Sequence, residues 1–179
     1  MAEQGSFTDA APSAGAPMRR ISGRRMEALL RSAALGDIVS VMMRAPRHKG
    51  LPLAALRVNV LPAVLHNQYL IARVRPQDNG ESVAAGLALW ASVSDEVNQR
   101  LSASKELPLR LTPEEWKSGS NLWLVDLVAP SALARSMLKD LDEKVAQGRP
   151  IAAHAVSGDG TASLTTVRAL LAGLAQEPA

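Results

Sequence analysis

Two side chains in this sequence are not explained by the periodicity of the segments around them. His48 lies in a polar loop directly after an apolar helical pattern, and Asp126 is the single carboxylate in the apolar run 122–129. An imidazole titrates near neutrality and can accept a proton, while a carboxylate can hold its tautomer and stabilise the imidazolium. Taken alone, His48 also fits an ordinary loop histidine. Asp126 fits a solvated sheet face as well as a site, because burying a lone carboxylate is costly.

The remaining candidate side chains favour no metal and no nucleophile chemistry. His66 fits a loop and His154 fits a hydrogen-bonded place on an apolar strand, and no His-Glu-x-x-His spacing is present. The chain has no cysteine, which excludes disulfides, thiolate metal sites and cysteine nucleophiles. It also lacks a Walker loop, a G-x-G-x-x-G after a strand and a G-x-S-x-G elbow, which disfavours ATP, dinucleotide and serine-hydrolase chemistry.

The composition is that of a globular protein with a slight basic excess. Of 179 residues, 47% are apolar and 21% charged, and the net charge is +3; this allows one domain with a hydrophobic core. The basic residues gather in segments 19–31 and 44–49. Only one Tyr and one Phe are present, so we expect no nucleic-acid partner. No long apolar run or secretory signature appears, so we expect a cytoplasmic protein with no membrane span.

The positions of the helices and strands follow from apolar spacing and turn residues. Residues 1–18 have too few large apolar side chains to offset their ordering entropy and predict a disordered arm. The spacing over 22–44 predicts a helix, interrupted or split at Gly36-Asp37. Segments 68–74 and 82–93 predict two strands, and Asn79-Gly80 between them is typical of a hairpin.

The second half of the chain continues this mixture of elements. We expect a helix over 94–103 with Ser94 as its cap and a helix over 131–145 with Ser131 as its cap. A further short helix is expected to begin at Thr112-Pro113. Strands are expected over 122–128 and 151–156. The fold class is therefore mixed α/β, with residues 19–179 forming one domain around a mostly antiparallel sheet. Gly86 inside the second strand indicates either a bulge or the close approach of another group to the backbone.

Several short motifs occur in the same order as in one protein family. Leu-Arg-Val-Asn-Val-Leu-Pro-Ala-Val-Leu-His-Asn-Gln-Tyr occupies 56–69, and Pro-Arg-His precedes it at 46–48. Leu-Trp-Ala-Ser-Val-Ser follows at 89–94, then Glu-Trp-Lys-Ser-Gly at 115–119 and Trp-Leu-Val-Asp-Leu-Val-Ala-Pro at 123–130. The chain thus resembles the toxin-activating lysine acyltransferases over roughly residues 35–130, and several collinear motifs are far more specific than one short pattern.

The resemblance implies a GNAT-like fold, a homodimer, and transfer of a fatty acyl group from acyl carrier protein to internal lysines of repeats-in-toxin proteins. It places the catalytic pair on His48 and Asp126, and it gives Asn59 a role in ordering the substrate or the oxyanion. No bound cofactor is implied, and acyl-acyl carrier protein serves as donor. The part after Pro130 and the N-terminal arm depart from the family pattern, so the acceptor stays open.

The chemistry of such a transfer suits these residues. A lysine with a reference pKa of about 10.4 must lose a proton before it attacks a thioester, and His48 is the candidate base. Asp126 orients either His48 or the incoming lysine, and the sequence leaves both roles open. The missing glycines at 129–134 favour acyl carrier protein over acyl-CoA as donor. The basic segments are either a docking surface for that acidic partner or a solvated face.

Two other functions fit the same sequence. One is a lysine acyltransferase that acts on a small ribosomal peptide or on a secreted protein that is not a toxin. The other is a non-catalytic module that binds acyl carrier protein, although such a module has no evident need for both His48 and Asp126.

Overall fold

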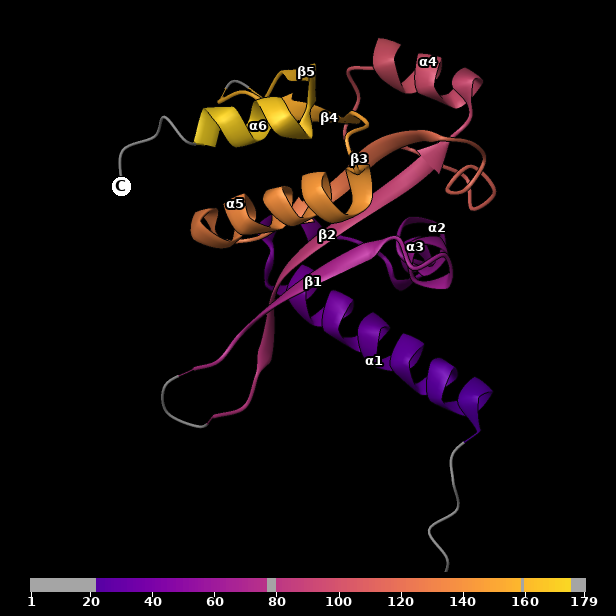
Figure 1. The fold of residues 1–179 in the computed structure, drawn as a ribbon, viewed down its shortest axis with the longest axis vertical. Coiled ribbons are helices and arrows are strands. Elements are labelled where there is room, and N and C mark those ends of the chain that lie inside the picture. The colour runs from indigo at the N-terminus through magenta and orange to yellow at the C-terminus, as the bar shows by residue number, and fades with distance from the viewer. Residues whose placement is uncertain (1–21, 77–79, 159, 175–179) are drawn as a thin grey trace, which may run out of the picture.

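A five-stranded mixed sheet organises the computed structural model, which describes residues 22–76, 80–158 and 160–174 (Figure 1). The strands are β1 (Tyr69–Val74), β2 (Val83–Val93), β3 (Asn121–Val128), β4 (Ile151–Val156) and β5 (Ala162–Thr166), in that spatial order. All neighbouring strands are antiparallel except β3 and β4, which are parallel to each other. The expected mixed α/β class with a mostly antiparallel sheet is confirmed, and the arrangement is consistent with a GNAT-like fold.

Helices cover both faces of this sheet, as Figure 1 shows. One face carries α1 (Gly23–Arg44), α2 (Leu56–Asn59) and α3 (Leu61–Leu65), joined by the short turns η1 (Pro46–His48) and η2 (Leu53–Ala55). The other face carries α5 (Ser131–Asp140), its π-helical continuation η3 (Leu141–Ala146) and α6 (Val167–Leu174). Helix α4 (Asp95–Ala103) follows β2. No helix of the described ranges is both long and apolar enough to cross a bilayer.

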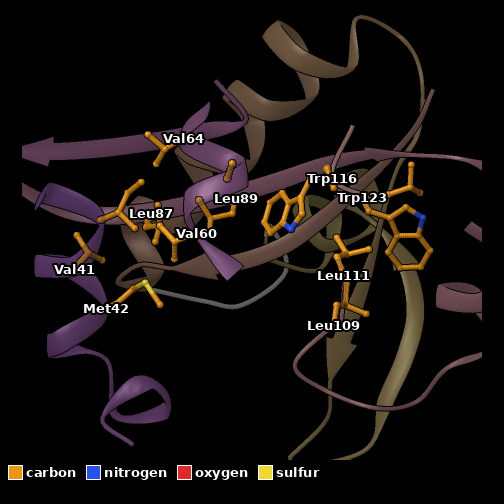
Figure 2. Packing of buried hydrophobic residues seen from close by; sticks show 14 of the residues in the cluster. Val41, Met42, Val60, Val64, Leu87, Leu89, Leu109, Leu111, Trp116 and Trp123 are labelled. Carbon is orange, nitrogen blue, oxygen red and sulfur yellow. The ribbon is translucent and has the colours of Figure 1, made fainter. Parts of the chain in front are cut away.

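The larger core lies between the sheet and α1, α3 and α4 (Figure 2). Trp116 and Trp123 are its largest fully buried side chains, and each indole N–H has a partner. Trp116 Nε1 donates to the Val58 carbonyl at 3.1 Å, and Trp123 Nε1 donates to Asn98 Oδ1 at 2.8 Å. Burying both rings without leaving a donor unpaired fixes α2 and α4 against the sheet.

Two local expectations about helices differ from the structure. Helix α1 is continuous through Gly36 and Asp37, where the Asp37 carboxylate accepts a hydrogen bond from Arg73 of β1. After Thr112 the chain forms a turn and no helix: Glu115 Oε2 accepts from the Thr112 N–H at 2.9 Å, but the Trp116 carbonyl then bonds Ser92 of β2. Pairing with the sheet thus overrides the local helix signal.

The expected caps also had different outcomes. Ser94 caps α4, because its Oγ accepts from the Val97 N–H at 3.3 Å. Ser131 is the first residue of α5 and its side chain makes no cap; Pro130 occupies the cap position. The expected disordered arm, residues 1–18, and Asn79 of the hairpin lie outside the described residues, whereas Gly80 has a φ of 69°.

Gly86 lies where β2 is both irregular and crowded. The β1–β2 register shifts between Ala72 and Arg73, so one residue next to Gly86 is extra, as a bulge requires. A Cβ at Gly86 would lie 2.7 Å from Met137 Sδ of α5 and 3.3 Å from Ala72 Cβ. The bulge is therefore present, and the space that a side chain would need is filled by α5.

Candidate functional site

His48 is held at the end of the long helix α1. Its backbone N–H donates to the Ala45 carbonyl at 3.0 Å, which closes the η1 turn immediately after α1. The last turns of α1 are anchored in turn, because Ile38 and Val41 are buried and Arg44 donates to the Ala84 carbonyl of β2. The imidazole is thus placed by a packed helix, although its loop carries no apolar pattern.

Asp126 is aimed by an irregularity in β3. Leu89 of β2 lies opposite Asp126, but the next residue, Trp90, lies opposite Leu124, so Val125 is an extra residue in β3. Opposite residues share a face, and Leu89 belongs to the core on the α1 side. Without the bulge, Asp126 would share the face of Leu124, which packs under α5. The bulge therefore turns the carboxylate toward η1.

These two elements bring the predicted pair into contact. His48 Nε2 lies 3.0 Å from Asp126 Oδ2, and the two side chains are only 12% and 16% exposed. The carboxylate can accept a hydrogen from Nε2 whenever that nitrogen is protonated. In that state Nδ1 is the nitrogen left to exchange a proton with a substrate. Of the two roles open for Asp126, the geometry favours orienting His48.

Arg47 is a third member of the site, which the sequence placed in a basic segment and in the Pro-Arg-His motif without predicting a role for it in the site. Its guanidinium donates to Asp126 Oδ1 and to the Leu127 carbonyl. Arg47 Nε also donates to His48 Nε2 at 3.2 Å, and this bond forms when that nitrogen carries no hydrogen. The position directly before His48 is the only sequence signal that could have indicated this role.

The Leu127 carbonyl is available to Arg47 because β3 and β4 separate. The two parallel strands pair only at Leu122 with Ile151 and at Trp123 with Ala152. Beyond these positions Asp126 and Leu127 lie on a stretch of β3 whose β4 side carries no ladder partner within the described chain. An unpaired strand edge beside the His48–Asp126 contact gives the site a border of backbone polar groups.

Asn59, the third predicted site residue, is not joined to the pair. It is the last residue of α2 and half-buried, and no hydrogen bond links its amide to His48 or Asp126 among the described residues. Leu56, one turn earlier in α2, lines a pocket together with His48. The structure thus places α2 at the border of the site, while the Asn59 amide makes no hydrogen bond to the pair within the described part of the chain.

That pocket has a volume of about 210 Å³ and lies beside the imidazole. Apart from His48, every lining side chain is apolar: Val39, Met42, Met43, Leu51, Leu53 and Leu56. They come from the last two turns of α1, from the loop between η1 and η2, from η2 and from the start of α2. A proton-accepting group therefore borders an apolar recess.

The other two histidines lie apart from this arrangement. His66 is exposed after α3. His154 of β4 packs its ring edge-on against Trp123, with ring centroids 5.4 Å apart, and both of its nitrogens are buried without a hydrogen-bond partner in the described ranges. Burial lowers the pKa of His154 below its usual value. No cluster of metal-binding side chains occurs within residues 22–76, 80–158 and 160–174.

Fold and site together define an α/β protein with a largely buried histidine–carboxylate pair of the kind that can transfer protons. Residues 27–168 match the model of the RTX toxin acyltransferase family. This match covers most of the sequence, so the chain belongs to that family, and the resemblance seen in the motifs is confirmed.

Relatives with assigned names agree with this family. The leukotoxin-activating lysine-acyltransferase LktC of Pasteurella haemolytica-like sp. is 33% identical over 109 residues, which are 61% of this chain and 61% of that protein. LktC serotype A1 of Mannheimia haemolytica is 33% identical over 110 residues, 62% and 60% of the two chains. The RTX-I toxin-activating lysine-acyltransferase ApxIC of Actinobacillus pleuropneumoniae is 27% identical over 109 residues, 60% and 57%. The chain thus covers about 60% of the length of these relatives.

Proposed function

We propose that this protein is a protein-lysine acyltransferase that moves a fatty acyl group from acyl carrier protein onto internal lysines of a repeats-in-toxin protoxin. The observation that carries the proposal is the 3.0 Å contact between His48 and Asp126 in a member of the RTX toxin acyltransferase family. The names of the relatives, which describe lysine acylation and toxin activation, support the same reaction.

The reaction begins with removal of a proton from the lysine. His48 Nδ1 accepts it, and Asp126 stabilises the resulting imidazolium through the Nε2–H bond. The neutral amine then attacks the thioester carbonyl, so that a C–N bond forms and a tetrahedral oxyanion results. As the C–S bond breaks, the imidazolium gives its proton to the departing thiolate, and the second proton on the attacking nitrogen passes to water, which leaves a neutral amide. The products are an amide on the lysine and a free carrier thiol, and no covalent enzyme intermediate is needed.

The oxyanion requires hydrogen-bond donors that are already in place. We propose backbone N–H groups and the Asn59 amide for this role. Asn59 stands at the end of α2, the helix that also contributes Leu56 to the pocket beside His48. A modest rearrangement of the Asn59 side chain on substrate binding is part of this proposal, since catalytic hydrogen bonds often tighten only in the complex.

Acyl carrier protein is the donor that this chain suits better than acyl-CoA. After β3 the chain continues Ala-Pro-Ser-Ala-Leu-Ala at 129–134, without the glycines that cradle a pyrophosphate at a helix start. Arg24 and Arg25 at the start of α1 are exposed and could attract an acidic carrier. Arg44 and Arg47 are instead held by Ala84 and Asp126. No bound cofactor is needed, and acylation before toxin secretion makes the cytoplasm the proposed site of action.

The test is acylation of a candidate protoxin by the full chain with palmitoyl-acyl carrier protein, read as a lysine mass shift. We expect His48→Ala to lower the rate by about 10²- to 10⁴-fold. Asp126→Asn should be similarly severe, and the double variant should lose much less than the product of the two losses, because the pair acts as a unit. His66→Ala is the matched control, since His66 is exposed and outside the site.

The outcomes separate the alternatives. If folded His48→Ala protein acylates at a near wild-type rate, the mechanism is wrong. Transfer to another peptide or secreted protein, but not to a protoxin, would establish the same enzyme with a different acceptor. Tight binding of acyl carrier protein with no transfer to any lysine would make the protein a binding module.

A further inference from the structure

We propose that the apolar pocket beside His48 binds the acyl chain of the donor. This proposal rests on the proposed function and assigns the acyl-binding part of the same site. The pocket is lined by His48 and six apolar side chains from α1, η2, α2 and the loop between η1 and η2. Its occupant is therefore a hydrocarbon whose reacting end lies near the imidazole.

The position of the base fixes where such a chain must start. His48 can take a proton only from a lysine nitrogen within about 3 Å, and that nitrogen attacks a carbonyl carbon about 3 to 3.5 Å further on. The carbonyl of the donor thus comes within a few ångströms of His48. The carbons that follow it need an apolar surface beginning at that point, and the recess formed by Met42, Leu51 and Leu56 begins there.

The mouth of the pocket exposes apolar side chains that the core does not use. Met43 is 72% exposed and Leu53 is 81% exposed, yet both line the recess whose inner wall, Met42, is only 5% exposed. A continuous path from buried to exposed apolar side chains fits a flexible chain that enters from the surface. Methionine side chains adapt well to such a ligand, because they are unbranched and can change rotamer.

The volume sets how much of the chain the recess can take. An apolar cavity of roughly 150 Å³ holds benzene, and the 210 Å³ recess, which is open to solvent on one side, has room for a similar number of carbons. The carbons nearest the thioester would lie in the recess, and a longer chain would extend over Met43 and Leu53 at its mouth. The site should therefore favour long over short acyl groups.

The first experiment compares donors of different length with variants of the mouth and the wall. Met43→Glu and Leu53→Glu place a charge at the mouth, and Val39→Phe fills the recess from α1. Leu164→Glu is the control, because Leu164 on β5 is 53% exposed and does not line the pocket. The measured quantity is kcat/KM for palmitoyl donor divided by kcat/KM for butyryl donor.

We expect this ratio to fall by about 10- to 60-fold in Met43→Glu and Leu53→Glu, since each methylene that loses its apolar contact costs about fourfold. The ratio should stay at the wild-type value in Leu164→Glu. Val39→Phe fills the part of the recess that both donors use, so it should lower kcat/KM for both. A ratio that is the same in Met43→Glu, Leu53→Glu and Leu164→Glu overturns the acyl site. It leaves the proposed function standing if the wild type transfers acyl groups, whereas absence of any transfer by the wild type contradicts the proposed function itself.

A second experiment reads binding without turnover. A palmitoyl-acyl carrier protein thioester with a diazirine near its carbonyl is photolysed on the full-length protein, and labelled peptides are mapped by mass spectrometry. Label within residues 39–56 supports the site, and its loss in Val39→Phe but not in Leu164→Glu strengthens the assignment. Label confined to other segments would show that the acyl chain does not occupy the recess. If Met43→Glu changes the molecular mass of the protein in solution but not its chain-length preference, another protein molecule occupies the recess instead.

Discussion

At the residue scale, Arg47 holds the carboxylate that contacts His48. Its guanidinium donates to Asp126 Oδ1, while Asp126 Oδ2 lies 3.0 Å from the imidazole. A charged donor on one oxygen restricts rotation of the carboxylate. Arg47 therefore fixes the position from which Asp126 contacts His48.

We therefore predict that Arg47→Gln lowers kcat for lysine acylation by roughly tenfold, because Asp126 loses the charged donor that holds its Oδ1. Both kcat and KM are measured for lysine acylation at low and high salt. Lys49→Gln serves as control, because Lys49 is exposed and forms no ion pair with Asp126 in the described residues. Identical losses in the two variants would show that only overall surface charge matters.

His154 gives a second prediction at this scale, concerning stability. Burial lowers the pKa of His154 in the folded protein, so below its unfolded value of about 6.5 the unfolded chain binds more protons. Stability is then fully present above that pH and is lost as the pH falls through the folded pKa. We expect urea midpoints at about pH 7 and pH 5.5 to differ less in His154→Leu than in the wild type. His66→Leu, altered at an exposed histidine, should keep the wild-type difference.

At the element scale, the connection from α4 to β3 depends on close backbone contact. A Cβ on Gly119 would lie 2.5 Å from the Val93 carbonyl oxygen and 2.8 Å from the Ser94 nitrogen, both backbone atoms at the end of β2. The Gly119 N–H also donates to the Ser92 carbonyl at 3.1 Å. This contact sets where the chain enters β3 and thus where Asp126 lies along it.

We predict that Gly119→Ala lowers the free energy of unfolding by about 1–3 kcal/mol, because the backbone must shift to make room. Gly36→Ala is the matched control: it lies inside α1, its Cβ would meet nothing within 4 Å, and alanine should stabilise the helix by about 0.5–1 kcal/mol. Both values come from urea unfolding. Equal effects of the two substitutions would contradict the close-contact argument.

At the scale of the whole molecule, the first half of α1 projects from the domain (Figure 1). Its first buried residue is Ala34, whereas Met26, Leu29 and Leu30 are 44%, 50% and 61% exposed. An isolated helical segment of this length is marginal in water, and clustered exposed apolar side chains are typical of an interaction surface. We propose that this half of α1 packs against a second copy in a homodimer.

The prediction is a dimer mass by light scattering at micromolar concentration for the wild type. Replacing both Leu29 and Leu30 with Glu should give a monomer, since two charges would be buried at the interface. Leu164→Glu, on β5, should remain dimeric. A monomeric wild type would contradict the dimer and leave the first half of α1 without a partner.

The sequence alone determined much of the fold and the identity of the pair. Apolar runs and caps are local signals, so β2, β3, β4 and the Ser94 cap were predictable, and His48 and Asp126 stood out against their surroundings. Local pattern also misplaced one element: the turn at Thr112 has helix chemistry, but its backbone groups bond to β2.

Only the tertiary structure decided the direction in which Asp126 points. The run 122–129 is apolar on both faces of β3, so its alternation carries no information about which face a residue occupies. The extra residue Val125 became visible only through its pairing with β2. The role of Arg47 and the pocket beside His48 likewise depend on segments far apart in the chain. Contacts of that kind are set by packing, which periodicity along one segment does not encode.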